Sequence, residues 1–413
     1  MSQTEVISLG CRLNTFEAEM MREQLQHLEN TIIINTCAVT IEAERQTRQT
    51  IRRARRDNPD ARLIVTGCAA QLNPARYGAM PEVDKVLGNR EKLDPSAFLF
   101  GHEKDPIVVS DIMVATETAA HLIHGFDDRC RAFVEIQQGC DHRCNFCIIP
   151  FARGPCRSVN FIRIVDQVRI LTEQGFKEIV LTGVDICSYG TDLPGKPSLG
   201  NLVRRLLTAV PELPRLRFSS LDPAAIDNAL YEVLAEEQRV MPHFHLSIQA
   251  LDDTVLKRMK RRHLFADVEA VVANVRSVRS DVIIGADLIA GFPTETDQQF
   301  ANTLTRVNEL GLAHLHVFPY SERPGTPAAR MPQIAPEIRK ERARALRETG
   351  ATALAQFMAN QVGTEAAVLV EGSDRGLSEH YVPVRINGET MPGEIQAVTL
   401  TGAGTDHLVG IPA

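Results

Sequence analysis

The chain has 413 residues, of which 44% are hydrophobic and 23% charged, the usual balance of a globular protein in water. Its apolar runs fall well short of the ~18 residues that a membrane span needs. Residues 1–9 enter a strand pattern with no basic or apolar leader, so we expect neither a membrane protein nor an exported one. Nine cysteines, an odd number with close clusters, favour metal binding in a reducing cytoplasm over a disulfide framework.

Residues 1–100 form the first predicted domain, in which short apolar strands alternate with helical patterns. Helices are expected near 14–28 and 40–56, between strands at Val6–Leu9, Ile32–Ile34, Leu63–Val65 and Val83–Leu87. Such alternation predicts a parallel sheet with helices on both faces. Residues 101–130 are less regular, and we assign them to a linker.

A cysteine directly follows each of the first three strands: Cys11, Cys37 and Cys68. Because the carboxyl ends of parallel strands lie along one edge of a sheet, these three cysteines should meet in space. The alternative is that they are buried small hydrophobic residues, a common role of free cysteine. Their identical place in each strand–loop–helix unit favours a shared site.

Residues 131–355 form a second domain with a new strand–helix alternation. Six strands are expected, at Phe133–Ile136, Glu178–Leu181, Leu216–Ser219, His243–Ile248, Val282–Ile289 and Leu315–Phe318. Six such units predict a partial (β/α)6 barrel, whose active site lies at the carboxyl ends of the strands.

Three cysteines, Cys140, Cys144 and Cys147, follow the first barrel strand at C-x₃-C-x₂-C spacing. Three thiolates on one loop can hold three irons of a [4Fe–4S] cluster, which normally takes four thiolates. The fourth iron is then open to a small molecule. The alternative is zinc, but zinc needs four ligands, and only His142 lies at a matching distance in the sequence.

The C-terminal region, 356–413, changes to short alternating strands separated by glycine turns. A charged helix at Pro336–Ala355 precedes strands expected at Ala366–Val370, Tyr381–Ile386, Glu394–Leu400 and His407–Ile411. This pattern predicts a small all-β barrel of the OB-like kind, a type that includes nucleic-acid-binding modules. The whole chain is therefore of the α/β class, with three domains.

The cysteine loop, with Phe146 just before its third cysteine, resembles the radical S-adenosylmethionine (SAM) superfamily. Three further segments, Leu9–Asn14, Asn35–Thr40 and Gly67–Gln71, resemble the cysteine motifs of its methylthiotransferase family. The barrel of that family is matched by Gly139–Cys147, Ile148–Gly154 with Arg157-Ser158, Leu181–Asp185 and Gly285–Glu295. The resemblance covers essentially the whole chain in the right domain order and identifies the C-terminal barrel with the family's TRAM domain.

The resemblance implies two [4Fe–4S] clusters and SAM. The radical cluster would lie on Cys140, Cys144 and Cys147, and an auxiliary cluster carrying the sulfur to be transferred on Cys11, Cys37 and Cys68. In the family one SAM methylates that sulfur and a second yields a 5′-deoxyadenosyl radical, so that a C–H bond becomes C–S–CH₃. No catalytic side chain is expected beyond the cluster ligands, and the electron donor would be a protein such as flavodoxin or ferredoxin.

The SAM contacts are expected near the mouth of the barrel. Gly183 and Asp185 occupy the place of the superfamily's Gly-Gly-Glu-like segment, which binds the SAM amino group. Ser219, Gln249 and Asp287 lie at or near the ends of later strands and would line the same mouth. The alternative for each polar residue is ordinary hydrogen bonding at a strand end.

The segments Asn35–Thr40 and Ile51–Ala54 resemble the branch of the family that acts on N6-threonylcarbamoyladenosine beside the tRNA anticodon, at adenosine 37. The branch that acts on N6-isopentenyladenosine in tRNA is the alternative within the family. From another class, a non-catalytic iron–sulfur protein that binds RNA or senses redox state is also considered.

A tRNA substrate requires basic surface, although the net charge of the chain is −7. Four arginines, Arg45, Arg48, Arg52 and Arg55, recur on one helix face and are predicted to contact the anticodon-loop region of tRNA. Two further basic runs lie at 257–262 and 339–347. The alternative for each run is a solvated helix face.

Overall fold

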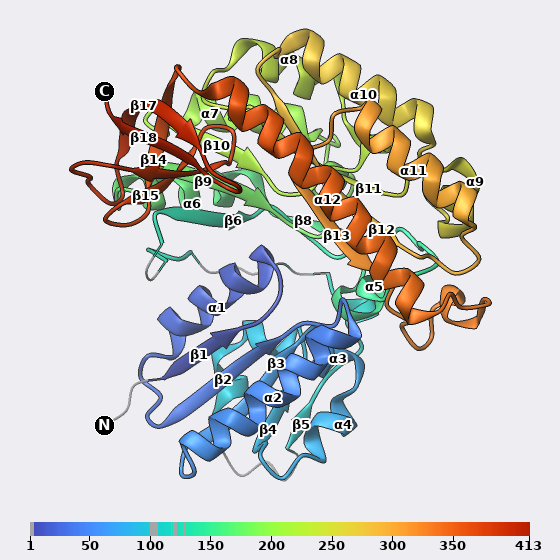
Figure 1. Cartoon of the computed structure of the whole chain (residues 1–413). Helices are drawn as coiled ribbons and strands as arrows, with labels where there is room; N and C mark the ends of the chain where they lie inside the picture. Colours follow the sequence, from blue (N-terminus) through green and yellow to red (C-terminus); the bar gives the residue numbers. More distant parts are fainter. Residues whose placement is uncertain (1–3, 100–105, 117, 119–121, 127–128) are drawn as a thin grey trace.

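The computed structural model describes residues 4–99, 106–116, 118, 122–126 and 129–413. Figure 1 shows an N-terminal α/β domain packed beneath a larger open barrel, with a small β-barrel beside it. A long helix crosses the outside of the large barrel and leads to the small one. The three predicted architectures are therefore present in the predicted order.

The N-terminal domain is a parallel sheet with the order β1-β2-β3-β4-β5. Its strands are β1 (Glu5–Ser8), β2 (Thr31–Thr36), β3 (Arg62–Gly67), β4 (Lys85–Leu87) and β5 (Ile107–Val108). Its helices are α1 (Arg12–Leu25), α2 (Ile41–Asp57), α3 (Cys68–Leu72) and α4 (Pro74–Gly78). The strand β5 lies in the range assigned to a linker, so that assignment was wrong there: the sheet continues beyond residue 100.

The two faces of this sheet have separate cores because successive strand residues point to opposite sides. Ile33 and Ile64 pack with α1, and this core continues into the large barrel. Ile34 and Val65 pack with α2, through Ile51. The first core joins the two domains, which places the carboxyl edge of the N-terminal sheet next to the barrel.

The central domain is a six-stranded parallel partial barrel, as predicted. Its strands are β6 (Arg131–Glu135), β9 (Glu178–Thr182), β10 (Arg215–Phe218), β11 (His243–Gln249), β12 (Ile283–Ala290) and β13 (Leu315–Pro319). They form two three-stranded sheets, joined by a parallel bridge between Leu221 and Leu246. The covering helices are α6 (Phe161–Glu173), α7 (Leu199–Ala209), α8 (Asn228–Glu236), α9 (Asp253–Met259), α10 (Phe265–Val278) and α11 (Asp297–Glu309).

The cysteine loop of the barrel is closed at its base by a short antiparallel pair, β7 (Gln137–Gln138) and β8 (Arg157–Ser158). Between the loop and β8 lies the helix α5 (Ile149–Arg153), which packs against α3 of the N-terminal domain. Figure 1 shows α5 at the junction of the two domains. The loop is therefore held on one side by the barrel and on the other by the N-terminal sheet.

The helix α12 (Pro336–Gln361) continues past the predicted domain boundary at residue 355, because its last turns belong to the small barrel. Met358 lies in the core of that barrel. The closed barrel has the order β14-β15-β16-β18-β17, with strands β14 (Glu365–Val370), β15 (Arg375–Ser378), β16 (Pro383–Ile386), β17 (Ile395–Ala403) and β18 (Leu408–Pro412). The short β15, which lacks a clear apolar alternation, was not predicted.

All three domains meet at Tyr381 of the small barrel. Its ring stacks on His243 of β11 at 5.0 Å between centroids, and Arg12 of α1 donates to its hydroxyl at 3.3 Å. The backbone of Tyr381 has φ +63°, a left-handed conformation that costs a non-glycine residue energy. The contact therefore holds the small barrel in one place.

Within the described part of the chain, none of the helices has the length and apolarity required to cross a bilayer.

Candidate active site

The structure brings Cys11, Cys37 and Cys68 to the carboxyl edge of the N-terminal sheet, where the topology predicts them. Cys11 precedes α1, Cys37 follows β2, and Cys68 begins α3. Gly10 has φ +104°, and a Cβ there would lie 2.6 Å from the Cβ of Cys37. Glycine is thus required for the first loop to approach the second so closely.

The three thiols influence one another. Burial raises the pKa of Cys37 to about 12, with further contributions from Cys68 and Cys11. The pKa of Cys11 is also raised, by desolvation of its sulfur and by the neighbouring Cys68, although the residue as a whole is exposed. Three neighbouring thiolates repel one another, so a cationic group such as a metal centre would stabilise their ionised form.

The spacing of the sulfurs bears on which metal centre fits. Ligands of one zinc ion lie within about 4 Å of one another, because Zn–S bonds are about 2.3 Å long. Among the described residues, two sets of three potential ligands have atoms within 4.8 Å of one another: Cys140, His142 and Asp185, and His245, Asp287 and His316. Neither set is a cysteine triplet. The wider triplets suit a polynuclear cluster, so the residues present fit an iron–sulfur centre.

The barrel's cysteine loop is shaped by backbone contacts. The Cys140 N–H donates to the Gly154 carbonyl at 3.0 Å, and the Cys147 N–H to the Cys144 carbonyl at 3.1 Å. Gly139 has φ +68°, and a Cβ there would lie 1.9 Å from the Pro155 carbonyl oxygen. The loop therefore requires glycine immediately before its first cysteine.

The surroundings of this loop are apolar on one side and charged on the other. Phe146 packs edge-on against Phe292, with 6.5 Å between ring centroids. Burial raises the pKa of Cys147 to about 11, and the neighbouring Cys144 adds to this. The Nη1 atom of Arg261 lies 3.6 Å from the Cys144 sulfur. Sequence reasoning placed Arg261 in a run of possible phosphate contacts, whereas the structure buries it beside the cysteine loop.

Two of the five predicted SAM contacts lie beside this loop. The Asp185 carboxylate is 2.9 Å from the His142 ring, and burial, followed by Asp185, raises the pKa of Cys140 to about 12. Gly183 lies against Gln137, whose side-chain oxygen accepts the N–H groups of Val184 and Asp185 at 3.0 and 2.8 Å. Gln137, which sequence reasoning did not single out, therefore holds this segment in place.

Each of the other three predicted contacts has its own local environment at or within a barrel strand. Ser219 is buried and its N–H donates to the Leu181 carbonyl, an ordinary strand-end bond. Gln249 ends β11 with φ +74°. Asp287 lies in the middle of β12, where its carboxylate is 3.0 Å from His245 and 3.3 Å from His316. Although burial opposes it, hydrogen bonding to these histidines holds the pKa of Asp287 well below its usual range.

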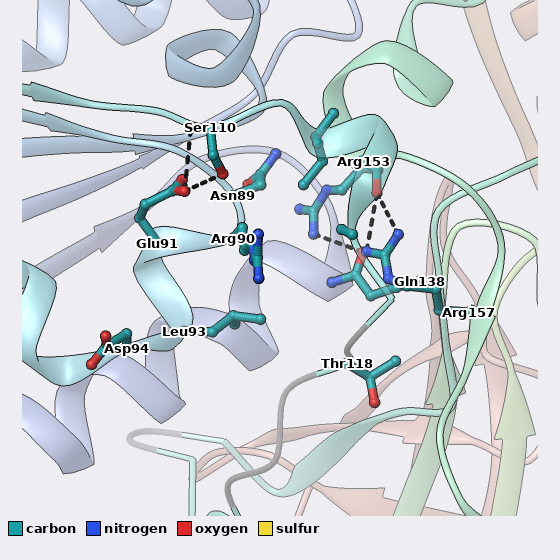
Figure 2. A pocket seen from close by; sticks show the side chains of 12 residues that line it. Asn89, Arg90, Glu91, Leu93, Asp94, Ser110, Thr118, Gln138, Arg153 and Arg157 are labelled. Atoms are coloured by element: carbon teal, nitrogen blue, oxygen red, sulfur yellow. Dashed lines mark hydrogen bonds between the residues drawn. The ribbon is translucent and has the colours of Figure 1, made fainter.

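A network of buried charges between the two domains was missed by sequence reasoning. Arg153, at the end of α5, reaches Cys68 and also pairs with Glu17 of α1. Lys92 pairs with the same Glu17 at 2.6 Å. These residues adjoin a cavity of about 380 Å³, shown in Figure 2, which Arg153 and Asn89 help to line. No local sequence pattern marks this network, because it forms only when two domains pack together.

The four arginines predicted to contact RNA all lie on α2, but they differ in their contacts. Arg45 is exposed and pairs with Glu42, and Arg52 is exposed and lies 3.8 Å from Glu82. Arg48 is half-buried and lies 3.9 Å from Glu44. Arg55 is fully occupied within the domain, by Asp84 and the carbonyls of Pro59, Ala61 and Glu82. RNA binding by this face remains a prediction, and it is now centred on the exposed members.

The other two basic runs are mainly structural. Arg258 donates to the Thr294 carbonyl, and Arg342 is buried against Glu295 and Asp297. Arg339 donates to the carbonyl of residue 320, just after β13, and Arg347 to the carbonyl of residue 317, within β13. Most of these side chains stabilise the barrel and its long helix.

Comparison with known proteins agrees with this geometry. Family models match residues 134–307 (Radical SAM superfamily) and 3–88 (Uncharacterized protein family UPF0004). A Rickettsia prowazekii protein named threonylcarbamoyladenosine tRNA methylthiotransferase MtaB is 50% identical, covering 96% of this chain and 94% of its own. A tRNA-2-methylthio-N(6)-dimethylallyladenosine synthase of Cereibacter sphaeroides is 30% identical, covering 97% of this chain and 96% of its own.

Among solved structures, the radical S-adenosylmethionine methyltransferase TsrM from Kitasatospora setae superimposes with a TM-score of 0.53 at 15% identity, covering 80% of this chain and 77% of its own. The fold and the cysteine loop define a radical SAM enzyme, a class that uses SAM and a [4Fe–4S] cluster. With 50% identity to a relative over nearly its whole length, the chain belongs to the radical SAM methylthiotransferase family.

Proposed function

We propose that the chain converts N6-threonylcarbamoyladenosine at position 37 of tRNA, beside the anticodon, to its 2-methylthio derivative. The observation that carries this proposal is the connection between the two cysteine sites. The helix α5 follows directly on the radical SAM loop, and its last residue, Arg153, is 3.1 Å from Cys68 of the other site. A sulfur carried at the N-terminal edge is thus held next to the barrel that generates the radical.

The proposal includes a second [4Fe–4S] cluster, held by Cys11, Cys37 and Cys68, beside the cluster on the barrel loop. When bound, SAM and the two clusters supply a hydrogen-abstracting radical and the methylated sulfur that replaces an inert C–H hydrogen. The reducing electron comes from a protein such as flavodoxin or ferredoxin, and the enzyme acts in the cytoplasm, where its tRNA substrate lies.

The residues of the chain position these groups. Gln137 holds the segment from Gly183 to Asp185 against the barrel loop, where we place the SAM amino group. Phe146 and Phe292 exclude water from one side of the loop, which protects a radical from side reactions. Asp287 lies deeper in the barrel, at a position suited to orient a bound nucleoside or the ribose of SAM.

The choice of nucleoside is supported by the relatives. The Rickettsia prowazekii protein named for threonylcarbamoyladenosine is 50% identical, against 30% for the dimethylallyladenosine synthase. The segment 35–40, at the end of β2 and in the loop before α2, and the segment 51–54 of α2 also resemble the first branch. Activity on isopentenyladenosine is the second candidate, and a non-catalytic iron–sulfur protein the third.

An assay with purified protein separates these candidates. The anaerobically reconstituted enzyme receives SAM, dithionite and tRNA carrying either N6-threonylcarbamoyladenosine or N6-isopentenyladenosine. The proposal predicts 5′-deoxyadenosine and a 2-methylthio product with the first tRNA, and neither with the Cys144→Ala variant. If only the second tRNA yields a product, the proposed substrate nucleoside is wrong. If 5′-deoxyadenosine is no higher than with Cys144→Ala, the proposed enzymatic activity is wrong.

A further inference from the structure

Arg153 is the residue through which the barrel domain contacts a ligand of the N-terminal site. Its side chain is only 3% exposed. The Nε–H group points at the Cys68 sulfur, 3.1 Å away. Figure 2 shows the arginine beside Gln138, to which it donates a hydrogen bond, among the side chains that line the cavity. A guanidinium so placed is a charged donor to a cysteine sulfur.

All five N–H donors of this guanidinium have a partner. Besides the bond to Cys68, Nη1 donates to Glu17 and to Gln138, and Nη2 donates to Asn14 and to the second oxygen of Glu17. The two contacts with Glu17 form the bidentate fork that arginine makes with carboxylates. The direction of the Nε–H group toward Cys68 is therefore fixed by four other bonds.

The three cysteines of this site differ in their donors. The Cys11 sulfur lies 3.8 Å from the side-chain oxygen of Asn14, an uncharged partner. Cys68 instead receives the charged donor of Arg153, and the Asn89 amide nitrogen lies 3.9 Å from its sulfur. The cation is therefore directed at one ligand of the three.

Arg153 belongs to a buried cluster of ionisable side chains that includes Glu17, Lys92 and Glu135. Burial opposes it, but Arg153 and Lys92 hold the pKa of Glu17 at about 2, so this carboxylate stays ionised. Burial and the nearby Glu17 raise the pKa of Glu135 to about 8, which keeps that carboxyl group neutral near pH 7. The ionised Glu17 thus pairs with both Arg153 and Lys92 in one buried cluster beside the three cysteines.

We propose that Arg153 is a positioning residue that sets the reduction potential of the auxiliary cluster by donating a charged N–H···S bond to Cys68. Hydrogen bonds to the sulfurs and local charge are two of the factors that set the potential of an iron–sulfur cluster. A cation at a ligand sulfur stabilises the more negative, reduced cluster and so raises the potential. The proposal rests on the second cluster of the proposed function and does not depend on the nucleoside.

The most direct test needs no change at Arg153. The test uses a full-length variant that retains only the auxiliary site, with the substitutions Cys140→Ala, Cys144→Ala and Cys147→Ala. This protein is labelled with ¹⁵N-arginine, loaded with iron and sulfide, and reduced. Electron spin-echo envelope modulation should then show a ¹⁵N nucleus coupled to the reduced cluster. A spectrum without ¹⁵N coupling would overturn the proposal. If this protein takes up no cluster at all, the claim that the chain holds a second cluster is wrong, and with it the proposed function.

A second test measures the midpoint potential by redox titration followed by EPR in the same triple-alanine protein. Arg153→Gln should lower the potential, and Arg153→Lys, which keeps the charge, should lower it less. The double variant Glu17→Gln/Arg153→Gln removes both partners and keeps the net charge, so it avoids a buried unpaired carboxylate and should still lower the potential. Iron content is measured in parallel to verify that each variant holds its cluster.

Arg157→Gln is the matched control. This arginine is also buried in the same segment, but it donates to the carbonyls of Arg153 and Pro155. Its loss should shift the potential less than the loss of Arg153. A potential that is unchanged in the Glu17→Gln/Arg153→Gln protein, or a shift in Arg153→Gln no larger than in Arg157→Gln, would overturn the role given to the N–H···S bond.

Discussion

Glu17 of α1 and Arg153 of α5 form a buried bidentate ion pair that joins the N-terminal domain to the radical SAM loop. The Glu17 side chain is completely buried, and Lys92 is its second cationic partner. The pair lies between two cysteine sites that are far apart in the sequence. It therefore contributes both to the stability of the domain interface and to the charge near the N-terminal cysteine site.

Removing Glu17 should strongly destabilise the fold. The Glu17→Ala variant leaves Arg153 and Lys92 without their carboxylate, and an unpaired buried charge costs about 3–5 kcal/mol. Urea unfolding of the cluster-free protein, followed by circular dichroism, measures the loss. The control is Glu42→Ala, which breaks an exposed pair with Arg45 and should leave unfolding unchanged. Similar midpoints for the two variants would contradict the role of the buried network.

The stability of the chain should depend on pH through Glu135. Burial, followed by the Glu17 carboxylate, raises the pKa of Glu135 to about 8, whereas a glutamate in the unfolded chain has a pKa of about 4.3. The folded state therefore holds an extra proton between these values. This contribution to stability is complete below the lower pKa and is lost as pH rises toward the higher one, by on the order of 1 kcal/mol per pH unit.

The variant Glu135→Gln tests this dependence, because an amide keeps the shape and cannot titrate. Unfolding free energies of wild type and variant are measured from pH 5 to pH 9. The wild-type curve should fall more steeply than the variant curve up to about pH 8 and run parallel to it above. Curves that run parallel over the whole range would show that Glu135 is ionised in the fold.

Loss of one auxiliary cysteine should separate the two chemical steps. Cys37→Ala should abolish the methylthiolated product, because the sulfur has no cluster to carry it, while 5′-deoxyadenosine is still formed from SAM. Cys144→Ala should lose both. Cys130→Ala, which changes a cysteine outside both sites, should keep both. Full product formation by Cys37→Ala would remove the sulfur-carrying role from Cys11, Cys37 and Cys68.

The exposed arginines of α2 should contribute to tRNA binding. Arg45→Glu/Arg52→Glu reverses two exposed charges without touching Arg55, which holds its own domain together. The dissociation constant should rise, and the slope of log K against log salt should become shallower by about 1 for each phosphate that the protein no longer neutralises. Arg204→Glu, on the exposed face of α7, is the control. If the two variants bind tRNA with equal affinity, the α2 face is a solvated surface that does not contact tRNA.

The sequence predicts those features that follow from local periodicity and topology. The cysteines after β1, β2 and β3 meet because parallel strands share an edge, and this needs no knowledge of side-chain contacts. The strand β5 was missed because Ile107–Val108 is too short to show a pattern. The roles of Arg153 and Arg261 were missed because they arise only when distant segments pack, and a basic residue in the sequence does not reveal whether it faces solvent, a carbonyl or a thiolate.

The most direct test of the central claim is the nucleoside profile of tRNA from a strain that lacks this gene, measured by mass spectrometry. The proposed function predicts that 2-methylthio-N6-threonylcarbamoyladenosine disappears, that its unmethylthiolated precursor accumulates, and that the normal profile returns when the wild-type chain is supplied but not with Cys144→Ala. If that nucleoside persists and 2-methylthio-N6-isopentenyladenosine is lost instead, the assignment of the substrate is contradicted.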